Sequence, residues 1–237
     1  MIAVQLNKRD FEYDIHSLIR AFYPGMDVPV YQEGEAEPEG WEKKLVVDYQ
    51  SDQISLELVG KKNEILGKAQ RDVDYEADRK ATKNVLKSML YEMLKDHTGQ
   101  SLPWGNLTGI RPTKIPMALL EQGWKNTEIA DYMRKTYYTS NEKTALSIMI
   151  ANRERHILKD INYEDGYSLY VGIPFCPSIC LYCSFSSSPL AVWRDRVDSY
   201  LDALCREIEA CAQIYRNRKL DTIYMGGGTP TTLEPYQ

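Results

Sequence analysis

The sequence predicts an α+β domain over residues 1–165, followed by the beginning of a parallel βαβ unit over residues 166–237. The first domain is indicated by strand-like stretches in its first half and by amphipathic helices in its second half. The second domain is indicated by an apolar, β-rich stretch, a long amphipathic helix and another strand, in that order. A right-handed crossover is expected for that arrangement.

The first domain begins with a short predicted strand, MIAVQL, and an amphipathic helix, DFEYDIHSLIRAFYP, which Pro24 and Gly25 end. The apolar face of this helix consists of Phe11, Ile15, Leu18, Ile19 and Phe22. The acidic stretch YQEGEAEPEG is expected to be a solvated loop. Three strands of an antiparallel meander are predicted next, at KLVVDYQ, QISLELVG and EILGKAQRDV.

A long helix is predicted over residues 76–96, with Gly99 ending it. Its apolar stripe consists of Ala81, Val85, Met89 and Met93. The stretch SLPWGNLTGIRPTK, residues 101–114, is expected to be irregular because it carries two prolines and two glycines. The domain then ends in a predicted three-helix unit, with helices at 114–122, 127–136 and 140–159, and Ser140 begins the last of them with a sequence similar to a capping box.

The second domain follows a junction, INYEDG, with the predicted strand SLYVGIPF. A helix is predicted over residues 195–217. Its apolar positions are Val197, Leu201, Leu204, Ile208, Cys211 and Tyr215. DTIYMGGG then predicts a strand and a glycine turn. Two parallel strands and one helix are too few for an independent sheet, so we expect the domain to be incomplete, with its further βα units absent from these 237 residues.

Composition indicates an ordinary globular protein, with 43% hydrophobic and 27% charged residues. The chain contains no apolar run long enough to cross a membrane and no signal-peptide core, so we expect a cytoplasmic protein with no membrane span. Its net charge of -5 argues against nucleic-acid binding by overall charge. The stretch from 118 to 148 has a rhythm similar to a helix-turn-helix, but its third helix mixes acids with bases, so nucleic acid is not an expected partner.

Three of the five cysteines form a CX3CX2C motif directly after the strand SLYVGIPF, at Cys176, Cys180 and Cys183. A structural zinc site requires four ligands, and no suitable fourth ligand is evident. Three thiolates can instead hold a [4Fe-4S] cluster and leave one iron without a protein ligand. The spacing therefore favours an iron-sulfur site over a zinc site. The remaining cysteines, Cys205 and Cys211, lie on the predicted helix and are interpreted as structural.

Over residues 168–237 the sequence resembles the radical S-adenosylmethionine (SAM) enzymes, through this motif and YMGGGTPT at the end of the next strand. The resemblance implies a (β/α)6 partial TIM barrel, of which this chain would contain the first βαβ, truncated. It also implies a [4Fe-4S] cluster on Cys176, Cys180 and Cys183 whose open iron binds SAM. Reductive cleavage of that SAM would start hydrogen abstraction from the substrate. Both motifs follow carboxyl ends of strands, where barrel active sites collect.

The resemblance also implies further cofactor contacts. Tyr170 and Gly227 match positions that contact the SAM on the cluster, and Gly226 belongs to the same glycine motif. Tyr182, Gly228 and Thr229 match positions that line a second SAM, so one or two SAM molecules are implied. The glycines also suit such a role physically, because they let the backbone approach a ligand closely. No catalytic side chain is assigned.

The full pattern, with LPWGNLTGIRPTKI before it, resembles the HemZ-type oxygen-independent coproporphyrinogen III dehydrogenases. This implies decarboxylation of coproporphyrinogen III to protoporphyrinogen IX in heme biosynthesis. The implied partners are the porphyrinogen substrate, a low-potential electron donor such as flavodoxin or ferredoxin, and an unknown electron acceptor. The piece of 237 residues is expected to be inactive by itself.

The chain departs from that pattern at two positions, and these keep an alternative open. Gly172 stands where the branch has a histidine, and Phe185 stands where it has a fourth cysteine. A heme chaperone of the same superfamily, which binds heme without porphyrin turnover, is the alternative. A separate feature is the pair Arg111 and Lys114 beside Pro112, which is interpreted either as an anion contact at a helix start or as part of a surface loop.

Overall fold

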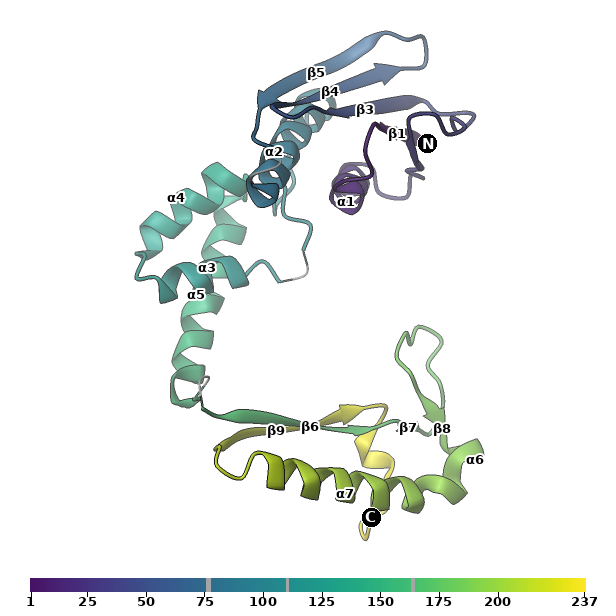
Figure 1. Cartoon of the computed structure of the whole chain (residues 1–237), viewed down its shortest axis with the longest axis vertical. Coiled ribbons are helices and arrows are strands. Elements are labelled where there is room, and N and C mark those ends of the chain that lie inside the picture. The colour runs from purple at the N-terminus through teal and green to yellow at the C-terminus, as the bar shows by residue number, and fades with distance from the viewer. Residues whose placement is uncertain (76–77, 110, 163–164) are drawn as a thin grey trace. The chain divides into compact units, whose positions relative to one another are not determined.

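The structure is a computed structural model that describes all residues except 76–77, 110 and 163–164. The described residues divide into two compact units, Met1–His156 (unit 1) and Ile157–Gln237 (unit 2), which Figure 1 draws in purple to teal and in green to yellow. The start of the predicted long helix, one position of the irregular stretch and part of the predicted junction lie outside the described residues. None of the described helices is long and apolar enough to cross a membrane.

Unit 1 contains a five-stranded mixed sheet in the order β2-β1-β3-β4-β5. The strands are β1 Ile2–Leu6, β2 Val30–Gln32, β3 Lys43–Tyr49, β4 Gln53–Gly60 and β5 Ile65–Asp72. β1 runs parallel to both of its neighbours, and the predicted antiparallel meander of β3, β4 and β5 is confirmed. The loop was predicted to start at Tyr31, and this is wrong for its first two residues. Tyr31 is buried and belongs to β2, where it pairs with Gln5 of β1.

Two helices, α1 Glu12–Phe22 and α2 Arg79–Thr98, pack together on one side of this sheet (Figure 1). The predicted apolar face of α1 is confirmed from Ile15 to Phe22. For α2 the predicted stripe is only partly right, because Ala81 is exposed while Thr82, Leu86 and Leu90 are buried. The reason is that α2 contacts both α1 and the strands β4 and β5, which covers a broader face than one stripe.

The second half of unit 1 contains the predicted helices, α3 Lys114–Glu121, α4 Asn126–Tyr137 and α5 Asn141–Ile157. Ser140 caps α5, since its Oγ accepts a hydrogen bond from the Lys143 backbone at 3.2 Å. The stretch before α3 is irregular, as predicted, but it is not only a surface loop. Gly105 and Asn106 are buried, and the Asn106 backbone donates to the Tyr137 carbonyl at 3.0 Å. This contact ties the stretch to the end of α4.

Unit 2 is built around β6 Tyr167–Ile173 and β9 Leu220–Gly227, which pair in parallel as predicted, with α7 Val197–Ile214 packed against them. The predicted strand from 168 to 175 is interrupted at Pro174, which has no backbone N–H for a strand ladder. Short elements complete the unit: β7 Phe175–Cys176, β8 Ser188–Pro189, α6 Leu190–Trp193, and 3-10 turns at Leu158–Asp160, Arg194–Arg196 and Pro230–Thr232. The α+β character is thus established, while the complete barrel stays a prediction.

Candidate functional site

The glycine motif and the first cysteine lie side by side at the carboxyl ends of β6 and β9. The Gly228 backbone donates to the Ile173 carbonyl at 2.7 Å, and the Thr229 backbone donates to the Phe175 carbonyl at 2.8 Å. These bonds continue the β6–β9 pairing past Pro174 and onto β7. The structure therefore brings together two sequence motifs that lie about 50 residues apart, as expected for adjacent parallel strands.

Two glycines are required by this close contact. Gly227 has φ of +104°, which L side chains rarely adopt, and a Cβ there would lie 2.8 Å from the Ile173 carbonyl oxygen. A Cβ on Gly228 would lie 2.7 Å from the Phe175 carbonyl oxygen and 2.8 Å from the Cys176 sulfur. Gly228 therefore makes room for Cys176, which is a structural role that the sequence motif did not reveal.

The three cysteines have different surroundings. Cys176 is buried, and its Sγ accepts a hydrogen bond from the Thr229 hydroxyl at 3.7 Å. Cys180 is exposed and Cys183 is half-buried, and both lie in the loop between β7 and β8, where the Cys183 backbone donates to the Cys180 carbonyl at 3.0 Å. Within the described part of the chain, no three Cys, His, Asp or Glu side chains converge as metal ligands. The sulfurs thus lie at the end of β7 and in the loop that follows it, without being gathered.

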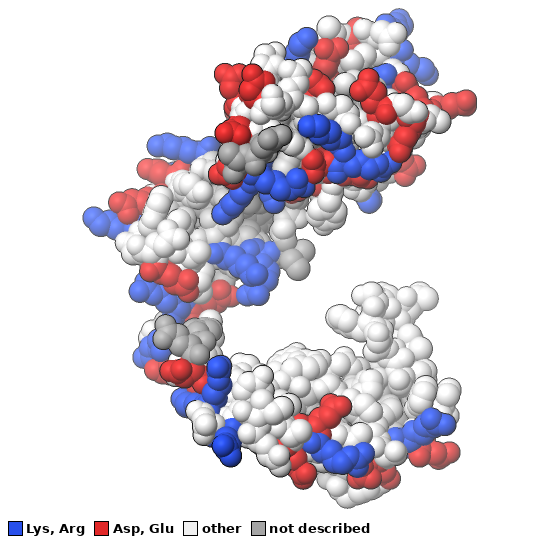
Figure 2. Space-filling model, viewed as in Figure 1, with Lys and Arg blue, Asp and Glu red and all other residues white. Residues whose placement is uncertain are grey.

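The donor set and its surroundings fit an iron-sulfur cluster. Three thiols on one loop are the ligand type that such clusters use, and the Cys176 sulfur already lies against the glycine cradle. Residues 166–193 and 222–233 contain no Asp, Glu, Lys or Arg. Figure 2 shows this uncharged surface on the strand and loop part of unit 2, with the charged side chains lying along α7. Burial and nearby charge are among the factors that set the potential of such clusters.

A pair of tyrosines lies over Gly226. Tyr170 on β6 is opposite Tyr224 on β9, and their ring centroids are 5.6 Å apart. A Cβ on Gly226 would lie 2.9 Å from the Tyr170 hydroxyl oxygen and 2.8 Å from the Tyr224 ring. Both rings are more than half exposed, on the side of the strands opposite the Leu169 and Val171 core positions. The structure therefore brings the predicted Tyr170 and Gly226 together, whereas the predicted Tyr182 projects from the cysteine loop at 89% exposure.

Tyr200 on α7 supports the site and was missed by the sequence analysis. Its hydroxyl donates to the Gly172 carbonyl at 2.7 Å, and its ring meets the Phe175 ring edge-on at 5.3 Å. Burial raises the pKa of Tyr200, and the negative charge of Glu207 adds to that effect. The signal was present, because Tyr200 follows Val197 by one helical step of three on the apolar face. Tyr224 was also missed, although its alternation with Gly226 places both on one face of β9.

Comparisons with known proteins match both halves of the chain. The "Oxygen-independent coproporphyrinogen-III oxidase-like protein HemZ" of Bacillus subtilis is 36% identical over 157 residues, which are 65% of this chain and 31% of HemZ. The chain is related to HemZ and to the oxygen-independent coproporphyrinogen III oxidases. The oxidase of Mannheimia haemolytica is 43% identical over 74 residues, 31% of this chain and 50% of that protein. The chain thus covers half or less of these relatives.

A third relative is named for a different function. The "Heme chaperone HemW" of Lactococcus lactis is 39% identical over 70 residues, 30% of this chain and 17% of HemW. No family model matches the chain. The HemZ match extends over 65% of the chain, whereas the oxidase and HemW matches each extend over about a third of it.

Proposed function

We propose that the chain belongs to a radical SAM oxidoreductase that converts coproporphyrinogen III to protoporphyrinogen IX by oxygen-independent oxidative decarboxylation. The observation that supports this best is the docking of Gly228 and Thr229 onto Cys176. In this contact the first cysteine of the CX3CX2C motif lies beside a closely packed glycine segment that carries no charged side chain. The relatedness to HemZ and the oxidases supports the substrate class.

In this proposal Cys176, Cys180 and Cys183 hold a [4Fe-4S] cluster with one iron left for SAM. When bound, the cluster supplies the low-potential electron that cleaves the SAM sulfonium. The chain's own residues position the ligands. The Gly226–Gly227 backbone and the Tyr170 ring contact the first SAM, and Thr229 donates its hydroxyl hydrogen to the Cys176 sulfur. Tyr182, Gly228 and Thr229 are the proposed contacts of a second SAM.

Loading the cluster has a structural consequence for the loop between β7 and β8. Cys176 is buried against Gly228, so it is the fixed ligand, while the exposed Cys180 must move toward it together with Cys183. The loop side chains Leu181 and Phe185 are 103% and 76% exposed and pack little in the present arrangement, so they oppose such a movement weakly. An external donor such as flavodoxin or ferredoxin and an electron acceptor complete the proposal.

The test is anaerobic reconstitution with iron and sulfide. We expect about four irons and four sulfides per chain, and an electron paramagnetic resonance spectrum of the reduced protein that changes when SAM is added. Cys180→Ala removes a proposed ligand and should abolish the cluster. Cys205→Ala is the matched control, because Cys205 is exposed on α7 and outside the motif. A zinc ion held by four protein ligands, or a spectrum indifferent to SAM, would contradict the proposal.

A heme chaperone is the second candidate function. Phe185 occupies the position after the motif where the oxidase pattern has another cysteine, and the chain matches HemW as well as the oxidases. This candidate predicts stoichiometric heme binding and SAM binding without formation of the divinyl product. Incubating the reconstituted protein with coproporphyrinogen III, SAM and a reductant, and analysing the porphyrins by chromatography, distinguishes the two functions.

A further inference from the structure

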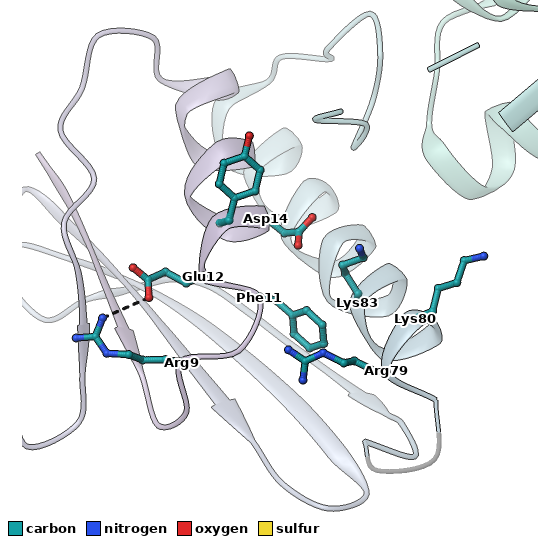
Figure 3. A pocket seen from close by; sticks show the side chains of 8 residues that line it. Arg9, Phe11, Glu12, Asp14, Arg79, Lys80 and Lys83 are labelled. Carbon is teal, nitrogen blue, oxygen red and sulfur yellow. Dashed lines mark hydrogen bonds and ion pairs between the residues drawn. The ribbon is translucent and has the colours of Figure 1, made fainter. Parts of the chain in front are cut away.

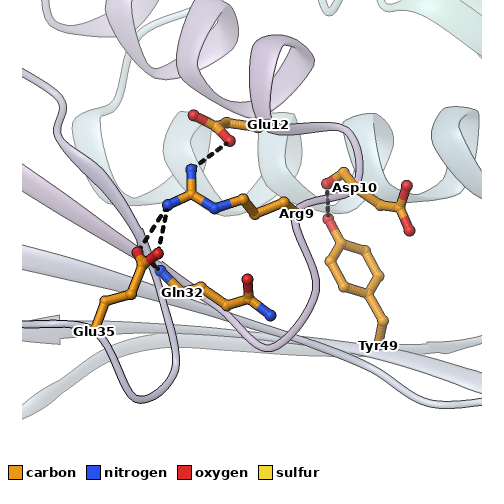
Figure 4. A network of polar contacts seen from close by, with 6 residues as sticks. All are labelled: Arg9, Asp10, Glu12, Gln32, Glu35 and Tyr49. Atoms are coloured by element: carbon orange, nitrogen blue, oxygen red, sulfur yellow. Dashed lines mark hydrogen bonds and ion pairs between the residues drawn. The ribbon is translucent and has the colours of Figure 1, made fainter.

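The turn between β1 and α1 in unit 1 holds a strained residue far in sequence from the cysteine motif. Phe11 has φ of 56° and ψ of 19°, a left-handed conformation that costs a residue with a side chain about 1 kcal/mol or more. The turn is anchored beside Phe11, because the Tyr49 hydroxyl donates to the Asp10 carbonyl at 2.8 Å (Figure 4). Backbone strain of this kind persists only where the surroundings impose it, and it is found often at ligand sites.

The side chain of Asp10 anchors the same turn to the start of α2. Its Oδ1 accepts a hydrogen bond from Arg79 at 2.6 Å, and its Oδ2 accepts one from the Tyr75 hydroxyl. The Tyr75 hydrogen bond and the Arg79 charge lower the pKa of Asp10. The guanidinium of Arg79 in turn lies over the Phe11 ring, 4.7 Å from its centroid. Phe11 is thereby held between the first turns of α1 and α2 (Figure 3).

An open cavity of about 570 Å³ lies over Phe11. This volume is within the range of about 300–1,000 Å³ that small-molecule sites occupy. Its basic side chains come from the turn before α1, at Arg9, and from the start of α2, at Arg79, Lys80 and Lys83, while the first turn of α1 contributes two acids. Figure 2 shows Lys and Arg side chains gathered on this region of unit 1. The cavity therefore combines an aromatic ring with positive charge.

Two of the basic side chains form no ion pair with any of the described residues. Lys80 and Lys83 line the cavity, and within the part of the chain that the structure describes neither forms an ion pair or a hydrogen bond. They lie three positions apart on α2 and are therefore neighbours on its surface. The positive charge of Lys83 also lowers the pKa of Lys87, after the larger effect of burial. The two ammonium groups thus remain available to an anionic ligand in the cavity.

The acids of the cavity are already engaged. Glu12 accepts a hydrogen bond from Arg9 at 3.3 Å, and Arg9 also binds Glu35 at 2.8 Å (Figure 4). Asp14 forms an ion pair with Lys87 at 3.5 Å. Both described acids of the cavity are therefore paired with other cations and not with the two lysines.

We propose that this cavity binds an organic anion that carries a planar ring and at least two negative groups. Lys80 and Lys83 bind the negative groups, and the ring lies against the exposed side of the Phe11–Arg79 stack. The negative groups have two sources, the carboxylates of a tetrapyrrole or the phosphates of a nucleotide, and the probes below distinguish them. The proposal is independent of the cysteine site, since all of its residues belong to unit 1.

The test is equilibrium binding to the full chain without a cluster, using coproporphyrin III, ATP and tripolyphosphate as probes. We expect a ring-bearing probe to bind with a Kd below about 1 mM and to weaken as salt is added. Lys80→Gln with Lys83→Gln should weaken this probe about tenfold, because two partly exposed ion pairs contribute about 0.7 kcal/mol each. Lys61→Gln with Lys62→Gln, in the turn between β4 and β5, removes the same charge elsewhere and should leave binding unchanged.

A second variant tests the ring contact. Phe11→Asn removes the ring but suits the left-handed backbone, since asparagine tolerates that conformation better than phenylalanine. It should weaken the ring-bearing probe and leave tripolyphosphate unchanged, with a far-ultraviolet circular dichroism spectrum that matches the wild type. The proposal is overturned if neither coproporphyrin III nor ATP binds below about 1 mM. It is equally overturned if the two lysine double variants bind alike, or if tripolyphosphate binds as tightly as the ring-bearing probes.

Discussion

Replacing Gly228 with alanine tests the contact between the glycine motif and Cys176. The added Cβ would lie 2.7 Å from the Phe175 carbonyl oxygen, 2.8 Å from the Cys176 sulfur and 2.9 Å from the Pro174 carbonyl oxygen. Two of these atoms belong to the backbone, so the clash cannot be relieved by turning a flexible side chain. We expect the end of β9 to separate from the segment between Ile173 and Cys176.

The size of the effect follows from the bonds that this separation breaks. The backbone bonds from Gly228 to Ile173 and from Thr229 to Phe175, 2.7 and 2.8 Å long, are lost together. At about 1 kcal/mol each, their loss favours the separated form by about 2 kcal/mol. That free energy corresponds to an increase of about 30-fold in the population of the open form. Cys176, which is buried in the closed form, becomes accessible in the open form.

The assay is the rate at which a maleimide labels Cys176 in cluster-free protein, followed by peptide mass spectrometry. The labelling rate follows the open population and should rise about 30-fold in Gly228→Ala. Gly172→Ala is the matched control, because its added Cβ would meet only the Tyr170 ring, at an ordinary 3.4 Å. Cys180 is exposed already and reports the intrinsic reactivity of the reagent. Equal labelling of Cys176 in both alanine variants would refute the steric reasoning.

Three further predictions concern the rest of the chain. Gly105→Ala should lower the free energy of unfolding of unit 1 by about 3 kcal/mol in urea, because φ is +58° and the new Cβ would lie 1.8 Å from the Tyr137 carbonyl oxygen. Gly109→Ala is the control and should be nearly neutral, because its new Cβ would meet nothing within 4 Å. Similar urea midpoints for the two variants would contradict this prediction. Tyr200→Phe leaves the Gly172 carbonyl without its 2.7 Å donor, so amide exchange in β6 should become several-fold faster, reflecting about 1 kcal/mol, and an unchanged rate would count against the bond. Asp10→Asn should lower stability at pH 7 by at most about 1 kcal/mol, since solvent screens the exposed ion pair. Because folding lowers the pKa of Asp10, this difference should be present in full above the ordinary pKa of 3.8 and should be lost as pH falls from there through the lower folded pKa; a difference that does not shrink on acidification would argue against an ionic origin.

Much of the architecture could be predicted from local patterns. The meander, the helices of unit 1 and the parallel strands of unit 2 follow from apolar periodicity and turn residues, which depend on near neighbours in the chain. The predictions failed where residues distant in the sequence determine which positions are buried or paired. Tyr31 joins a strand because β1 lies beside it, and Thr82, Leu86 and Leu90 are buried because α2 packs on both α1 and the sheet.

The candidate site divides in the same way. The CX3CX2C spacing and the glycine run are visible in the sequence, and their order along the chain predicted that both lie at the carboxyl ends of neighbouring strands. The pairing of Tyr170 with Tyr224, and the anchoring of Gly172 by Tyr200, depend on strand register and helix packing. A linear sequence does not specify these, because the register is set only when the apolar faces meet.

The sequence by itself determined the spacing of the three thiols of the CX3CX2C motif, since positions along the chain are fixed before any folding. Only the tertiary structure decided that Gly228 must be glycine because the Cys176 sulfur lies beside it. It also decided that Lys80 and Lys83 line one cavity together with Phe11. Both facts depend on how residues from different elements lie beside one another, and that arrangement exists only after the elements have packed.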